Sequence, residues 1–485
     1  MELIVPNKYK SIIEKITTLA LEMNVNVYIV GGFIRDIIMK REPKDLDIMI
    51  DMPNGGILFA EALSKKHGES NSLVVFPRFG TAQLNIDGEL VEFVMPRSEY
   101  YYEDSRKPDT QYTSVEADAL RRDFAMNAIF YRLNDGEFLD YTNHGLWDIH
   151  DKLISVTEVG SEDIIFTQDP LRMLRAIRFD CQLNFNISDL TWQGIERNVE
   201  KIKTISSERI RDELNKILLS EYPTRGIELL RSSKLIDYII PEINDIYNLE
   251  QPEEYHHKDV YDHTLLVLGN VKNDLNLRLA ALLHDIGKPV KREIIDGKIH
   301  FYEHEKASAD IARNILTRLK YPNDIIDDVC FIITNHMRPH SFKGNWSDSA
   351  VRRFIIDMGE HLNDVIEIVK ADVTSSSPNN VINHLNSLIE LMNRIIEVEK
   401  VAKSNDIKPL LNGNELMVMF NMPEGRWIKI LHEKLIDKQL ENPLMTKDEA
   451  KVFVREVIGD NPIDVWAENY KIFDLALKGG EGNEK

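Results

Sequence analysis

Cysteine is scarce in this sequence: only Cys181 and Cys330 occur among 485 residues, and neither belongs to a CxxC pair. This excludes a disulfide-stabilised scaffold and a thiolate zinc site, and both side chains are expected in the apolar core. Long hydrophobic runs are also missing, since no apolar stretch approaches the ~18 residues that a membrane-spanning helix needs. The segment 1–10 lacks the layout of a signal peptide, so we expect a soluble, cytoplasmic protein.

Positive charge is in deficit. Lys and Arg number 59 against 80 Asp and Glu, which gives a formal net charge of −21. Such a field repels nucleic acid at long range, so RNA could bind only through a local basic strip. With 43% hydrophobic and 29% charged residues the chain is nonetheless typical of a globular protein, and its length suits about three domains.

Hydrophobic periodicity divides the chain into a mixed N-terminal part and a helical remainder. Alternating apolar residues predict strands at 27–30, 46–50, 73–76, 81–86 and 90–95, and 3.6-residue periodicity predicts helices at 33–40 and 57–66. After Asp169 nearly every segment predicts an amphipathic helix. The polar stretch 248–257 and the segment 403–409 are expected to be breaks. The fold class is therefore α+β, with expected domains at 1–155, 156–247, 258–402 and 403–485.

The first candidate site begins where a strand runs into Gly31 and Gly32. Two glycines at a strand-to-helix turn let the backbone approach a ligand closely, and Arg35 one turn later could pair with phosphate. A tight turn without any ligand would explain the same glycines.

Three carboxylates follow. Asp45 and Asp47 are two residues apart and share one face of a predicted strand, and Glu92 lies inside another, strongly apolar strand. Side-by-side carboxylates repel one another unless a divalent cation neutralises them, and oxygen ligands suit Mg²⁺. We therefore predict a two-metal Mg²⁺ site in which Asp45 and Asp47 bind both ions and Glu92 binds the activating ion.

Two further segments carry polar groups at helical spacing. The segment 120–129 is predicted as a helix in which Asp123 and Asn127 share one face, although an exposed polar face would look the same. The next helix begins near Asp169 and carries three arginines at successive i+3 positions. This cationic stripe is the best candidate for holding nucleotide and RNA, and it consists of Arg172, Arg175 and Arg178.

The combination of these motifs resembles the class II tRNA nucleotidyltransferase and bacterial poly(A) polymerase family. The motifs are Gly31-Gly32-x-x-Arg35-Asp36, Asp45-x-Asp47, Arg121-Arg122-Asp123-Phe124-x-x-Asn127 and Asp169-Pro170-Leu171-Arg172-x-Leu174-Arg175-x-x-Arg178. The segments 140–148 and 207–214 also look like the family's connecting motifs, so the resemblance covers about the first half of the chain in order.

The resemblance implies a nucleotidyltransferase palm with a mixed or antiparallel sheet, followed by helical neck, body and tail domains that grip the 3′ end of tRNA. CTP and ATP would be the substrates, Mg²⁺ the cofactor, and the base edge would be read by Asp169 and Arg172. Contacts to the triphosphate or ribose are implied for Gly31, Gly32, Arg35, Arg121, Arg122, Asp123, Asn127, Arg175 and Arg178. A poly(A) polymerase shares these motifs and is the alternative.

Two local features bear on the product. Gln168 stands where the family often has an acid, which leaves the nucleotide preference open. The segment 97–112 looks like the flexible loop that relatives restricted to adding CC tend to lack, and its presence favours addition of CCA or of the terminal A.

The second half carries a separate set of histidines and aspartates. Residues of these types on several helices can form a mixed nitrogen and oxygen site for a divalent metal. The set resembles the HD phosphohydrolase superfamily and consists of His263, His284, Asp285, His304, His336 and Asp372. A phosphohydrolase with a nucleotide-sensing N-terminal half is therefore a further alternative. The segment 409–416 and the helices after it look like an RNA-contacting tail, and the oligomeric state is left open.

Overall fold

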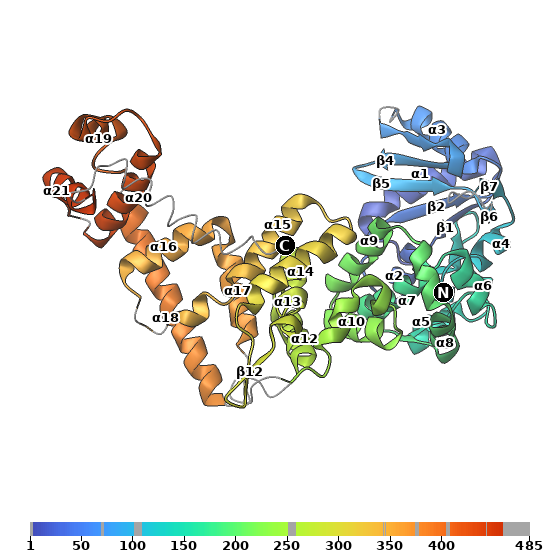
Figure 1. The fold of residues 1–485 in the computed structure, drawn as a ribbon. Helices are drawn as coiled ribbons and strands as arrows, with labels where there is room; N and C mark the ends of the chain where they lie inside the picture. Colours follow the sequence, from blue (N-terminus) through green and yellow to red (C-terminus); the bar gives the residue numbers. More distant parts are fainter. Residues whose placement is uncertain are drawn as a thin grey trace.

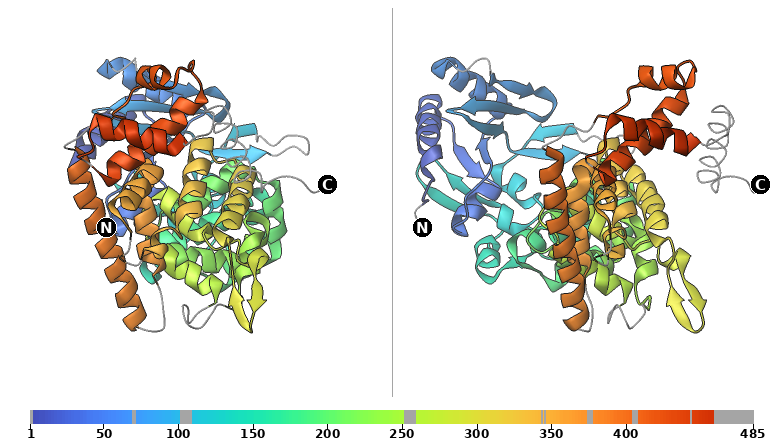
Figure 2. Two further views of the ribbon diagram at one scale, coloured as in Figure 1. Left: turned by 60° about the vertical axis from the view of Figure 1, so that its left-hand side comes forward. Right: turned by 90° about the vertical axis from the view of Figure 1, so that its left-hand side faces the viewer.

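A computed structural model of the protein describes residues 3–68, 72–100, 109–250, 259–342, 344, 346–373, 378–403, 408–442 and 444–458. The chain forms an arc, with a sheet-containing head at one end, helical layers in the middle and a small helical tail at the other end (Figure 1). The views in Figure 2 show that the long helix α18 (Pro378–Lys403) runs along the outside of this arc. Among the described helices, none is both long and apolar enough to cross a bilayer.

The head is built on a seven-stranded sheet with the order β3-β4-β5-β2-β1-β8-β9. Strands β2 and β5 are parallel, and the other neighbouring pairs are antiparallel. The strands are β1 (Val27–Val30), β2 (Leu46–Ile50), β3 (Val74–Phe76), β4 (Thr81–Ile86), β5 (Glu89–Val94), β8 (Ile129–Arg132) and β9 (Glu137–Asp140). The helices of the head are α1 (Asn7–Met23), α2 (Gly32–Ile38), α3 (Gly55–His67), α4 (Val115–Leu120) and α5 (Gly145–Asp151).

The centre of the sheet is buried on both faces. Leu46, Ile48 and Ile50 of β2 join the main apolar cluster, whereas Met49 joins a smaller cluster on the opposite face. Because side chains alternate along a strand, Asp47 shares the face of Met49. Burying the hydrophobic face therefore decides on which side of the sheet the acidic groups lie.

Helices make up nearly all of the remainder. The neck contains α6 (Glu162–Gln168), α7 (Leu171–Leu183), α8 (Asp189–Asn198), α9 (Ser207–Leu218), α10 (Pro223–Ser232) and α11 (Ile236–Ile239), and the short strands β10 (Leu153–Ile154) and β11 (Asn186–Ile187) pair beside it. The body contains α12 (Val260–Asn270), α13 (Leu275–Leu283), α14 (His304–Arg318), α15 (Asn323–Asn335), α16 (Asp348–Met358), α17 (Leu362–Asp372) and α18, with a hairpin of β12 (Glu293–Ile295) and β13 (Lys298–His300). The tail contains α19 (Gly413–Phe420), α20 (Arg426–Glu441) and α21 (Lys447–Ile458).

The apolar core shows how these parts are joined. One cluster extends from Tyr9 in α1 to Val398 in α18, so head, neck and body share a continuous core. The tail has a cluster of its own, between Leu411 and Ile458. The four domain boundaries given above stay predictions. Both cysteines are free and buried, as predicted.

The α+β fold class is confirmed, and all five predicted strands are present, with ends that agree to within one residue. The helix predicted at 120–129 is wrong. Helix α4 ends at Leu120, a 3₁₀ turn covers Ala125–Asn127, and Ile129 begins β8. The Asp123 carboxylate accepts a hydrogen bond from the Phe124 N–H at 2.8 Å, and such local side-chain bonds compete with helix formation.

One connecting segment is more regular than predicted. The expected flexible loop at 97–112 has an antiparallel hairpin at its base, formed by β6 (Arg97–Tyr100) and β7 (Asp109–Tyr112), while residues 101–108 lie outside the described residues. Most of the expected break at 248–257 also lies outside them.

Candidate active site

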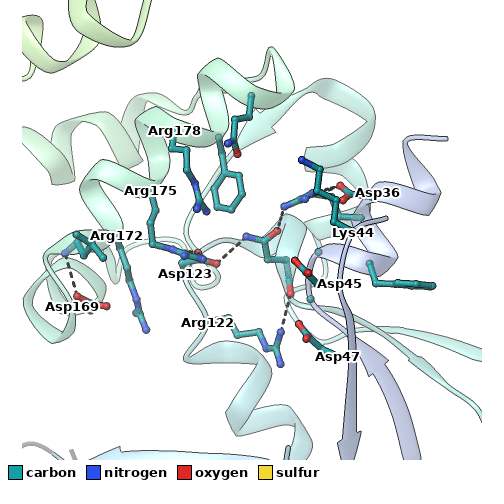
Figure 3. A pocket seen from close by; sticks show the side chains of 18 of the residues that line it. Asp36, Lys44, Asp45, Asp47, Arg122, Asp123, Asp169, Arg172, Arg175 and Arg178 are labelled. Carbon is teal, nitrogen blue, oxygen red and sulfur yellow. Dashed lines mark hydrogen bonds and ion pairs between the residues drawn. The ribbon is translucent and has the colours of Figure 1, made fainter. Parts of the chain in front are cut away.

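A pocket of about 620 Å³ lies between the head and the neck (Figure 3). Its walls come from the β1–α2 turn, the start of β2, the segment after α4, and helices α7 and α9. Nearly all predicted palm and neck residues line it. These are Gly31, Gly32, Arg35, Asp45, Asp47, Arg121, Arg122, Asp123, Asn127, Asp169, Arg172, Arg175 and Arg178.

Gly31 is required where the first strand meets the pocket. Its φ of +74° lies in the region that favours glycine, and a Cβ atom there would lie 3.2 Å from Oδ2 of Asp47. The turn can therefore run directly beside the acidic groups only without a side chain.

A chain of polar groups that line the pocket joins head to neck. Nη1 of Arg35 donates to Oδ1 of Asn127 at 2.8 Å, and Nδ2 of Asn127 donates to Oδ1 of Asp123 at 3.0 Å. The other oxygen of Asp123 accepts from Nε of Arg175, in α7, at 2.8 Å. Burial alone would raise the pKa of Asp123, but Arg175 and the hydrogen bond from Asn127 hold it well below its ordinary value.

The predicted acidic trio comes from adjacent strands. Asp47 is the register partner of Glu92 in the parallel β2–β5 pair, and Asp45 directly precedes β2. Burial and the nearby Glu92 raise the pKa of Asp47 to about 6, against the opposing effect of Arg122. Burial likewise raises the pKa of Glu92, and the negative charge of Asp45 raises it further. A divalent cation relieves this conflict, so the donor set fits a hard metal ion.

The ligand atoms of Asp45, Asp47 and Glu92 do not all lie within 4.8 Å of one another. Among the described residues, three-residue sets with ligand atoms within 4.8 Å of one another occur only in the body, and none includes these acids. Glu92 also does not line the pocket, whereas Asp45 and Asp47 do.

The two adjacent arginines of the head hold local structure as well as facing the pocket. Arg121 pairs with Asp118 at 2.7 Å and donates to the carbonyl oxygen of Arg97, at the base of the β6–β7 hairpin. Arg122 also pairs with Asp118, at 3.3 Å, and lies over the ring of Phe130. Both guanidinium groups are thus oriented before any ligand binds.

The two residues implied in base reading lie at the opposite end of the pocket from Asp47 (Figure 3). Oδ2 of Asp169 pairs with Nη2 of Arg209 at 2.9 Å, and Oδ1 accepts from the Leu171 N–H. Nη2 of Arg172 donates to the carbonyl oxygen of Arg121 at 2.7 Å. Both side chains are therefore held in place by groups of the protein itself.

Farther along α7, Arg178 is buried against Glu213 of α9, at 3.3 Å, and its ring contact is Phe179. Sequence reasoning did not assign several further lining residues to the site. Lys44 directly precedes the motif Asp45-x-Asp47 and Arg209 lies in the segment 207–214, so their positions in the sequence could have indicated them. The other unassigned lining residues are Phe33, Asp36, Leu171, Phe179 and Gln182.

The second predicted set converges inside the body. Nε2 of His263 lies 2.8 Å from Asp372 and 3.4 Å from Asp285. Asp285 is also 3.2 Å from Nε2 of His284 and 3.3 Å from Nε2 of His304. The structure thus brings together residues from α12, α14, α17 and the segment after α13, and it places His336 beside them, with its ring 5.3 Å from that of His284.

The imidazole rings are oriented as metal ligands usually are. Nδ1 of His284, His304 and His336 each lies 2.6–2.8 Å from the backbone carbonyl three residues earlier, which leaves Nε2 facing the cluster. Burial alone would lower the pKa of His284, but Asp285 and Asp372 raise it to about 10. His340, which was not predicted, lies 3.1 Å from the outer oxygen of Asp372.

The cluster contains two possible three-ligand sets that share one carboxylate. Asp285 belongs both to the set with His263 and His284 and to the set with His304 and His336. Mixed imidazole and carboxylate ligands fit a divalent transition metal.

Three family models match the chain in order. The poly(A) polymerase head domain matches residues 27–155, the probable RNA- and SrmB-binding site of polymerase A matches 184–247, and the HD domain matches 260–375. Through these matches the chain is similar to the tRNA nucleotidyltransferase and poly(A) polymerase family in its head and in the region after it.

Relatives within this family span most of the chain. It is 27% identical over 439 residues to a CC-adding tRNA nucleotidyltransferase of Thermus thermophilus, covering 88% of this chain and 92% of that protein. It is 29% identical to an A-adding tRNA nucleotidyltransferase of Deinococcus radiodurans, covering 72% and 81%. The crystal structure of the Bacillus stearothermophilus CCA-adding enzyme with CTP has a TM-score of 0.64 at 19% identity, covering 93% and 98%, which shows a shared fold.

The raised pKa of Asp47 predicts how the stability of the metal-free protein depends on pH. Because its pKa in the folded protein is about 6, Asp47 favours the folded state most when protonated, and this advantage is lost as pH rises through 6. We expect Asp47→Asn to raise the unfolding midpoint in EDTA by about 2–5 °C at pH 7.5 and by less at pH 5. Differential scanning calorimetry measures both midpoints.

Asp87→Asn is the control for this experiment. The carboxylate of Asp87 pairs with Lys15 at 2.7 Å, and this pairing lowers its pKa. Its replacement should not raise the midpoint at either pH. An unchanged or lower midpoint for Asp47→Asn at pH 7.5 would contradict the electrostatic conflict assigned to the trio.

Proposed function

We propose that this protein is a template-independent nucleotidyltransferase that adds CCA, or its terminal A, to the 3′ end of tRNA from CTP and ATP. The observation that carries the proposal is the pocket itself, which holds carboxylates at one end, Asp169 and Arg172 at the other, and arginines between them. Relatives named as tRNA nucleotidyltransferases support the same substrates.

In the proposed reaction the 3′-oxygen of RNA bonds to the α-phosphorus of the nucleotide. The bond from that phosphorus to the bridging oxygen of the β-phosphate breaks, pyrophosphate leaves, and the hydroxyl proton passes to solvent. Asp45, Asp47 and Glu92 would hold Mg²⁺, which when bound supplies positive charge next to the reacting phosphate. Arg35 and Arg175, fixed by the Asn127–Asp123 chain, bind and orient phosphate or ribose oxygens.

Base selection is assigned to Asp169 and Arg172. A carboxylate accepts hydrogen bonds and a guanidinium donates them, so the pair can complement the edge of a base without a nucleic-acid template. Their anchors, Arg209 and the carbonyl oxygen of Arg121, hold the pair in a fixed arrangement. Two rigid groups can thereby discriminate between bases of different donor and acceptor pattern.

The direct test uses tRNA transcripts that end before CCA, after C and after CC, with CTP and ATP supplied singly and together. We expect sequencing of the products to show extension that stops at A. Asp45→Ala should lower the rate by more than about a hundredfold, since it removes a metal ligand. Addition of long A tracts would instead support a poly(A) polymerase, and no extension would refute the proposal.

Replacement of Arg172 tests the assignment of base reading. Arg172→Ala removes the only base-edge donor assigned to this pair, so we expect the ratio of CTP to ATP incorporation to change by about tenfold. Arg197→Ala is the control, because Arg197 pairs with Asp163 on the exposed surface of the neck. Competition assays with both nucleotides give the ratio, and an unchanged ratio for Arg172→Ala would remove the assignment.

A second activity is supported by the body. We propose that the HD cluster hydrolyses phosphate esters, because six predicted residues converge there in an orientation suited to divalent metals. Manganese, nickel or cobalt, held by His263, His284, Asp285, His304, His336 and Asp372, would supply Lewis acidity. His284 must lose its proton when a metal binds, so metal affinity should fall as pH is lowered.

Hydrolysis of 2′,3′-cyclic nucleotides by the metal-free protein and after addition of Mg²⁺, Mn²⁺, Ni²⁺ or Co²⁺ tests this activity. We expect turnover with at least one metal, and its loss in Asp285→Asn, whose carboxylate is shared by both ligand sets. Extension of tRNA should survive Asp285→Asn, and hydrolysis should survive Asp45→Ala. Absence of turnover with every metal would count against the second activity.

A further inference from the structure

One cation of the active-site pocket differs from all the others. Eight cationic side chains line the pocket, and seven are arginines that each pair with a carboxylate or with a carbonyl oxygen. The eighth is Lys44, whose ammonium group has no hydrogen bond or ion pair to any residue that the structure describes. It is also exposed, unlike the buried Arg35 and Arg178.

The backbone that carries Lys44 is nonetheless fixed. The hydroxyl of Tyr9, a buried residue of α1, donates to the carbonyl oxygen of Lys44 at 3.3 Å. Three residues earlier, Arg41 donates to the carbonyl oxygen of Gln182 at the end of α7, at 2.9 Å. The segment before β2 is therefore tied to both α1 and the neck, and the side chain of Lys44 lines the pocket from a held position.

The position of Lys44 indicates what it faces. It directly precedes the candidate metal ligand Asp45, and in Figure 3 it lies next to Asp36, across the pocket from Asp169. Asp36 does not neutralise it, because its Oδ1 already accepts from Nε and Nη2 of Arg35. Lys44 thus offers a positive charge to a ligand at the end of the pocket opposite Asp169 and Arg172.

We propose that Lys44 binds the terminal phosphates of the incoming nucleotide and holds pyrophosphate as it leaves. A lysine ammonium is a flexible point charge that suits phosphate oxygens, and an unpaired one need not break an existing ion pair to bind them. A phosphate of the RNA backbone has the same chemistry, but the nucleotide places its triphosphate at the end of the pocket away from its base. The inference rests on the proposed function and assigns it a further binding residue.

The experiment compares the full-length wild-type protein with Lys44→Met, Lys44→Arg and Lys10→Met. The methionine keeps the apolar length of the side chain and removes its charge. Lys10 is an exposed lysine of α1, next to Tyr9 and outside the pocket, so Lys10→Met is the matched control. Dissociation constants for ATP and for inorganic pyrophosphate are measured by calorimetry with Mg²⁺, and KM values are measured for ATP and for tRNA ending in CC.

We expect Lys44→Met to weaken pyrophosphate and ATP binding by about five- to tenfold and to raise KM for ATP by a similar factor. KM for tRNA should stay within about twofold, Lys44→Arg should restore most of the loss, and Lys10→Met should match wild type. If Lys44 had only a structural role, Lys44→Met would not raise KM for ATP while leaving KM for tRNA nearly unchanged.

Three results would overturn the assignment, and they are distinguishable from failure of the proposed function. Wild-type binding of pyrophosphate and ATP that Lys44→Met leaves unchanged would remove Lys44 from the site. A rise in KM for tRNA alone would make it a contact to RNA phosphate instead. An equal loss in Lys10→Met would show a general charge effect. If the wild-type protein neither binds ATP nor extends tRNA, the proposed function itself fails.

Discussion

The ion pair between the buried Asp123 and the partly exposed Arg175 is the interaction on which the active-site pocket depends. Asp123 belongs to the head and Arg175 to the first long helix of the neck, so the pair fixes these two parts against each other. Its charge is compensated locally, because Asn127 donates to the same carboxylate and passes the connection on to Arg35. An unpaired Asp123 in this position would be costly, which makes the arrangement of the pocket walls specific.

The charges around the pocket are mainly positive, in contrast to the protein as a whole. A protein with a net charge of −21 concentrates eight cations against five carboxylates around one cavity, so the local sign is opposite to the overall one. Anionic substrates are therefore attracted at short range by a surface that the whole protein would repel at longer range. Most of these cations are paired with other groups of the protein, and this pairing holds them in position for a ligand.

The head and the body each contain a candidate site for divalent metal ions, but the two sites differ in ligand chemistry. The head offers carboxylates from adjacent strands, which suit a hard ion that also binds phosphate. The body offers imidazole and carboxylate groups from several helices, which are buried except for the partly exposed Asp372, and three of the imidazoles are oriented by backbone carbonyl oxygens. The two sets lie in parts of the chain that share one continuous apolar core, but they have no residue in common.

Five of the seven strands of the sheet, the helical second half and most residues of the pocket could be predicted from the sequence, because apolar periodicity and motif spacing are local properties. The prediction failed at 120–129, where Asp123 accepts from the Phe124 N–H and Ile129 pairs with β9, since the spacing of Asp123 and Asn127 also fits a tight turn. Only the tertiary structure decided that Glu92 stands beside Asp47, through the parallel pairing of strands far apart in sequence. It alone decided which cations are already paired, because the partners of the arginines come from other segments, and so it alone distinguished Lys44 from its neighbours.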